Sequence, residues 1–169
     1  MGILINIAEA AGWCDNRYTE RRALLDVSRI ESMTGAGPRT GSEPPADCGQ
    51  TRMVRKADAM IIAPASYNSI NRLVAGVADN YALAVVAELV GVGLPTVVVP
   101  FVNAALARRA PYQTALRVLL SEGIRVLGPG DQWEPHEPGA GGRSHGRLPW
   151  QQAFDIATAL TERTGDRHQ

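Results

Sequence analysis

The segment from Ala57 to Asn80 constrains the fold more than any other part of the chain. A short apolar run, Met60 to Ala63, stops at Pro64, and small hydroxyl and amide side chains follow the proline. Apolar residues then recur at helical spacing, at Ile70, Leu73, Val74 and Val77. This order of residues predicts a strand, a polar turn and a helix.

The polar turn is suited to binding an anion. Ser66, Asn68 and Ser69 lie between the expected strand and the expected helix, beside backbone N–H groups that have no intrahelical partner. The helix dipole adds partial positive charge there, so a phosphate or another anion is favoured. Ser and Asn are also preferred as turn and cap residues, so a purely structural role is the alternative interpretation.

Three motifs resemble those of the flavin-dependent cysteine decarboxylases. Residues 64–69, Pro-Ala-Ser-Tyr-Asn-Ser, resemble the family signature Pro-Ala-Ser-Ala-Asn-Thr, and residues 76–80 match the Gly-x-x-Asp-Asn that follows it. Residues 100–103, Pro-Phe-Val-Asn, are similar to the motif Pro-x-Met-Asn. The family includes 4'-phosphopantothenoylcysteine decarboxylases, lantibiotic peptidyl-cysteine decarboxylases and flavin prenyltransferases, and the resemblance spans about residues 57–127.

The resemblance implies an FMN-binding protein that carries out oxidative decarboxylation of a cysteine-containing small molecule or peptide. It places Ser66, Tyr67, Asn68 and Ser69 on the flavin, and it makes Asn68 and Asn103 the candidate catalytic residues. Asn103 is expected either to fix the substrate carboxylate or to cap the next helix. Tyr67 is expected either to stack on the flavin or to pack in the core.

Several residues depart from the family pattern. The proton-handling histidine that the family usually takes from its N-terminal half has no counterpart, and His136 is expected to be an exposed loop residue. Ile3 to Ala11 is expected to be helical, so the family's first strand and its Gly/Ser turn are expected to be absent. The alternative function is therefore a non-catalytic flavoprotein-like subunit that has lost part of the FMN site.

The rest of the chain predicts an α/β fold. Asp79 is expected to cap a helix from Tyr81 to Val90, and Thr96 to Pro100 reads as a buried strand. A further helix begins near Pro111 and carries an apolar face of Leu116, Leu119 and Leu120, and a short strand spans residues 124–127. This alternation predicts a three-layer, doubly wound parallel sheet with the Rossmann-like flavoprotein fold.

A single domain over residues 1–169 is expected, with loops at 35–50 and 128–148 and a last helix at 150–163. The chain has 17 basic and 17 acidic residues and no net charge, which argues against nucleic-acid or membrane partners. Cys14 and Cys48 lack the spacing of a zinc or thioredoxin-like site, so no metal is expected. With no charged-then-apolar leader evident, a reducing cytoplasm is the expected compartment. The apolar helix predicts a homo-oligomer, based on a trimer as in the family.

Overall fold

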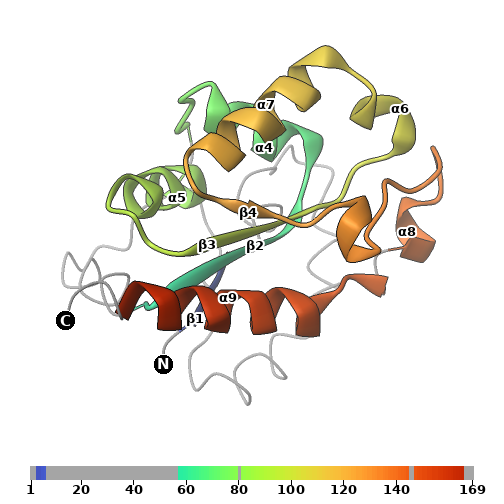
Figure 1. Ribbon diagram of the computed structural model, residues 1–169. Coiled ribbons are helices and arrows are strands. Elements are labelled where there is room, and N and C mark those ends of the chain that lie inside the picture. The colour runs from blue at the N-terminus through green and yellow to red at the C-terminus, as the bar shows by residue number, and fades with distance from the viewer. Residues whose placement is uncertain (1–2, 7–56, 80, 145–146, 166–169) are drawn as a thin grey trace.

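The computed structural model describes residues 3–6, 57–79, 81–144 and 147–165, and its centre is a parallel β-sheet (Figure 1). The four described strands lie side by side in chain order. They are β1 (Ile3–Asn6), β2 (Ala59–Ala65), β3 (Thr96–Pro100) and β4 (Arg125–Val126). All three neighbouring pairs are parallel.

The prediction of a helix from Ile3 to Ala11 is wrong for its first residues, because Ile3–Asn6 is strand β1. Ile3 pairs with Ala59 and Asn6 with Ile62. The β2 strand is buried along its whole length, so its backbone groups need hydrogen-bond partners at both edges, and β1 supplies one edge. Residues 7–11 and the expected loop at 35–50 lie outside the described residues.

The two central strands are apolar because both of their faces are covered. One face belongs to a cluster with Met60, Ile62 and Val98, and the other to a cluster with Ala59, Ile61, Val97 and Val99. Successive side chains of a strand point to opposite faces, so the unbroken apolar run fills two cores at once.

Helices cover the sheet on both sides (Figure 1). One side carries α4 (Tyr67–Val74), α5 (Tyr81–Gly91) and α7 (Ala110–Ser121), and α9 (Trp150–Gly165) covers the opposite side. Right-handed crossovers between strands in chain order place the connecting helices on the same face. The predicted α/β fold with three layers is thus confirmed. None of the described helices has the length and apolar character that crossing a membrane requires.

The end of α4 explains the glycine of the Gly-x-x-Asp-Asn segment. Gly76 has a φ of 70°, the N–H of Gly76 donates to the carbonyl of Leu73, and the N–H of Val77 donates to that of Arg72. These two bonds close the helix with a left-handed residue, a conformation that favours glycine. The Asp79 carboxylate pairs with Arg72 at 3.1 Å, and Asn80, which directly precedes α5, lies outside the described residues.

Candidate functional site

Two of the three motifs meet at the carboxyl ends of β2 and β3: the first motif, residues 64–69, and the second motif, residues 100–103. Ala65, the last residue of β2, pairs with Pro100, the last residue of β3. The Phe101 N–H donates to the Ala65 carbonyl over 2.7 Å. The turn that begins at Ser66 and the segment that ends at Asn103 therefore leave the sheet side by side, at the edge where parallel α/β sheets bind their ligands.

Ser66 is the N-cap of α4. Its Oγ accepts from the Ser69 N–H at 3.1 Å and lies 3.0 Å from the Ser69 Oγ. The Ser66 backbone is extended, with φ −72° and ψ 163°, as a helix N-cap requires. Both hydroxyls are thus engaged within the turn, which holds the first turn of α4 in a fixed conformation.

Asn68 and Tyr67 occupy the first turn of α4 with different surroundings. The half-buried Asn68 side chain makes no hydrogen bond to any residue of the described part of the chain. Tyr67 is also half-buried, and its ring stacks on that of the buried Tyr112 with centroids 6.1 Å apart. No acidic residue lies in this turn. An amide group and two helix-start N–H groups, those of Tyr67 and Asn68, are therefore free to meet an anion.

Asn103 caps α6 (Ala104–Ala107), which is the capping role expected as one alternative. Its Oδ1 accepts from the Leu106 N–H at 2.9 Å, and its backbone is extended. The Nδ2 group makes no hydrogen bond to any of the described residues. The cap fixes the orientation of the amide and leaves its donor group available, so capping and substrate contact are compatible. Val102, which replaces the family's methionine, is buried in the core.

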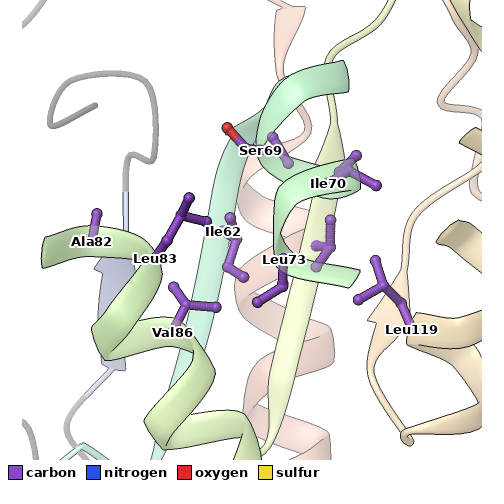
Figure 2. Close-up of a pocket in the computed structure, with 10 residues that line it drawn as sticks. Ile62, Ser69, Ile70, Leu73, Ala82, Leu83, Val86 and Leu119 are labelled. Atoms are coloured by element: carbon purple, nitrogen blue, oxygen red, sulfur yellow. The ribbon is translucent and has the colours of Figure 1, made fainter. Parts of the chain in front are cut away.

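A small gap lies beneath α4 and is a packing feature (Figure 2). Its volume is about 10 Å³, which is no more than one water molecule requires. Nine of its ten lining residues are apolar, and Ser69 supplies the only polar side chain. We therefore place no ligand in this gap.

A larger cavity of about 310 Å³ opens between the end of β3 and the segment 128–148. The Trp133 indole N–H donates to the Pro100 carbonyl over 2.6 Å, and its ring stacks on Phe101 at a centroid distance of 6.4 Å. Arg125 forms an ion pair with Asp131 at the start of the segment, in the short helix η3 (Pro129–Asp131). The expected surface loop is therefore fastened to the sheet edge, and it contains a second helix, α8 (Gly141–Ser144).

His136 lies next to the second motif, contrary to the exposed position expected for it. It is half-buried, and its ring centroid lies 4.9 Å from that of Phe101. Its backbone forms a bridge with Asn103, in which His136 N–H donates to the Val102 carbonyl and Ala104 N–H donates to the His136 carbonyl. Trp133 is 33 positions from Pro100, and His136 is as far from Asn103, so local sequence patterns do not reveal these contacts.

The cavity walls combine rings with charged and polar groups. They comprise Pro100, Phe101, Val102, Gln132, Trp133, Glu134, Pro135, His136, Ser144 and Arg147. Glu134 and Arg147 form no ion pair with any described residue, so each is available to a ligand. Trp133 and Arg147 were not predicted as site residues from the sequence. One signal was available for Trp133, because an indole in a Gly- and Pro-rich segment needs both an apolar surface and an acceptor.

Comparison with known proteins agrees with this geometry. The family model described as Flavoprotein matches residues 46–144, more than half of the chain. None of the curated proteins matches the sequence. Among solved structures, the FMN-dependent cysteine decarboxylase SpaF is 25% identical, with a TM-score of 0.58 and coverage of 85% of this chain and 76% of SpaF.

A second structure has the same kind of fold. The FMN-dependent cysteine decarboxylase TvaF from thioviridamide biosynthesis is 21% identical, with a TM-score of 0.50 and coverage of 69% of this chain. This chain spans 58% of the length of TvaF. The resemblance predicted from the motifs is confirmed, and the predicted cofactor is the one that both of these proteins use. The chain belongs to the flavoprotein family.

Proposed function

We propose that this protein binds FMN where β2 and β3 end and catalyses oxidative decarboxylation of a substrate that carries a C-terminal cysteine. The pairing of Ala65 with Pro100 carries the proposal, because it brings the Ser66–Ser69 turn and Asn103 to one edge of the sheet. Family membership and the similarity to SpaF support FMN as the cofactor and cysteine as the reacting group.

The residues of the first motif fit a flavin nucleotide. The start of α4 offers free N–H groups, the Asn68 amide lacks a described partner, and no carboxylate in the first turn would repel an anion. Ser66 and Ser69 fix this turn, and Tyr67 supplies one of the free N–H groups while its ring supports the turn against Tyr112. These four residues would hold FMN. The bound flavin supplies the two-electron oxidation of the substrate thiol to a thioaldehyde, from which carbon dioxide is lost readily.

The residues of the second motif provide the substrate side of the site. The Asn103 donor group is oriented by the α6 cap and would hydrogen-bond the substrate carboxylate. The adjacent cavity, with Trp133 and Phe101 in its walls, would accommodate the residues that precede the cysteine. In this arrangement the chain binds, orients and partly desolvates the group that reacts.

The test is incubation of the FMN-loaded protein with a short synthetic peptide ending in cysteine. We expect the peptide to lose the mass of carbon dioxide and two hydrogen atoms, whereas the same peptide ending in serine is unchanged. A protein that binds FMN but leaves the cysteine peptide intact would favour the non-catalytic subunit. A protein that binds no FMN would contradict the whole proposal.

We also propose that the chain forms a homo-oligomer, based on a trimer. Val77 and Val92, on either side of α5, are 40% and 73% exposed, and α5 itself contains a single charged residue, Glu88. Exposed apolar side chains at both ends of a helix with so little charge favour association. Light scattering from the FMN-bound protein should give a multiple of the chain mass, and a single-chain mass would contradict the proposal. Because two cysteines are too few for the disulfide frameworks of small secreted domains, we propose the cytoplasm as its location, which tagging of the protein in cells would test.

A further inference from the structure

The ring of His136 is held in one orientation at the cavity. Its Nδ1 lies 2.9 Å from the Glu137 carbonyl oxygen. A carbonyl oxygen only accepts hydrogen bonds, so Nδ1 must carry the proton in this contact. The neutral ring then has its lone pair on Nε2, which is the form of histidine that accepts a proton.

The Nε2 atom is available for this role. It has no hydrogen-bond partner among the described residues, and His136 is part of the cavity wall. Gly141 borders the ring at contact distance, since a Cβ there would lie 3.4 Å from its Cε1 and 3.6 Å from its Nε2. A fixed imidazole with a free acceptor therefore borders a space of substrate size.

The backbone bridge relates this base to the proposed carboxylate-binding residue. Paired residues of neighbouring β-segments project their side chains to the same side, and His136 is paired with Asn103. A substrate whose carboxylate is held by Asn103 would present its cysteine side chain within the same region. Two carboxylates and one guanidinium surround His136: Glu137 is next to it in the sequence, and Glu134 and Arg147 are in the cavity wall.

We propose that His136 is the catalytic base that accepts the proton of the substrate thiol. The proposal rests on the proposed function and assigns a residue to its proton transfer. The sulfur–hydrogen bond breaks, the proton binds Nε2, and the resulting thiolate faces an imidazolium. After carbon dioxide is lost, the imidazolium returns the proton to the sulfur of the product. The 135 residues before His136 contain no histidine that could serve instead.

Kinetics of the FMN-loaded protein test this role. In the wild type, kcat/KM for a cysteine-ending peptide should show an acidic limb, on which activity falls as the pH is lowered, because a protonated imidazole cannot accept the proton of the thiol. In His136→Gln the acidic limb should vanish, and activity at neutral pH should fall by about 100-fold or more. The remaining rate should rise with ionisation of the peptide's own thiol, whose ordinary pKa is about 8.5. His168→Gln removes another imidazole and should keep the wild-type profile.

Proton NMR provides a readout that does not depend on turnover. The flavin is first reduced, so that it cannot oxidise the peptide, and the His136 Cε1–H resonance is assigned from its loss in His136→Gln. The cysteine peptide should raise the titration midpoint of His136 by about one pH unit or more relative to the serine peptide, because a thiolate favours the imidazolium. The resonance of His168 should not respond.

The outcomes separate this proposal from the proposed function. Peptide decarboxylation with an unchanged pH profile in His136→Gln, or equal His136 midpoints with both peptides, would overturn the role of His136 and leave the proposed function standing. A protein that neither binds FMN nor changes the cysteine peptide would overturn both. Loss of the acidic limb together with the raised midpoint would establish His136 as the base.

Discussion

Asn103 provides the sharpest separation of structural and catalytic roles, because its two side-chain atoms have different tasks. Oδ1 caps α6 through Leu106, whereas Nδ2 is free in the described part of the chain. Asn103→Asp retains an oxygen acceptor and is an equally good N-cap, but it replaces the donor with a negative charge. Asn103→Ala removes both groups.

The two variants should therefore differ in stability but not in the direction of their effect on activity. Loss of the cap should destabilise Asn103→Ala by about 1 kcal/mol, which corresponds to about 2–4 °C in Tm for a chain of this size. Asn103→Asp should unfold close to the wild-type temperature. Loss of a hydrogen bond to a charged carboxylate costs about 1.5–3 kcal/mol, so kcat/KM for a cysteine-ending peptide should fall by about 10- to 150-fold in both.

Thermal unfolding and peptide turnover, measured on the same preparations, decide this prediction. The wild type and the two variants should be loaded equally with FMN before comparison. An Asn103→Asp variant with wild-type turnover would show that the free donor has no role in the reaction. Equal loss of stability in both variants would show that the cap argument is wrong.

Three further predictions concern other parts of the site and its support. Asn68→Ala should weaken FMN binding by about 1–3 kcal/mol without lowering Tm, whereas Ser66→Ala should lower stability by about 1 kcal/mol through loss of the α4 cap; fluorescence titration and thermal unfolding would expose the opposite pattern. Trp133→Phe keeps a ring but leaves the buried Pro100 carbonyl without its indole donor, so urea unfolding should show a loss of about 1–3 kcal/mol, and an unchanged midpoint would refute this. Burial raises the pKa of Tyr112 to about 12. The unfolded phenol ionises near its ordinary pKa of about 10, so burial of the neutral Tyr112 ring contributes its full stabilisation below about pH 10. As the pH rises through the pKa of the folded protein, the free energy of unfolding should fall by up to about 3 kcal/mol. Tyr112→Phe should lose less stability over this alkaline range, and identical pH profiles would contradict the assignment.

The sequence predicted the elements that local patterns determine. The apolar strands, the start of α7 near Pro111 and the polar turn after β2 all agree with the structure. The predicted apolar faces of the helices were less accurate, since Val77 lies beyond the end of α4 and Leu120 is 54% exposed. Periodicity marks an apolar stripe, but it does not show where the covering layer ends.

The final helix shows a related limit. The large side chain of Phe154 is 44% exposed, while Ala153 and Ala157 are fully buried against the sheet. Small residues allow α9 to approach the strands closely, and this depends on tertiary contacts that no local pattern records. In the same way, β1 was missed because four residues form a strand only through pairing with the edge of β2.

The candidate site was predictable where the chain is continuous and not where it folds back. Ser66 to Ser69 and Asn103 follow directly from strand ends, so motif and position agree. His136 reaches Asn103 only through the bridge made by the segment after β4, and its sequence neighbours are prolines and glutamates that suggest solvent. Long-range backbone pairing therefore brings His136 to the site, and local sequence patterns do not predict such pairing.

Titration of the purified protein with FMN tests the central claim most directly. We expect saturable binding with perturbed visible absorption bands of the oxidised flavin, and weaker binding by Asn68→Ala with an unchanged fold. Riboflavin, which lacks the phosphate, serves as a control and should bind more weakly, because the anion-favouring helix start then has no charged partner. A folded protein that shows no change in the flavin spectrum at any FMN concentration would contradict the account.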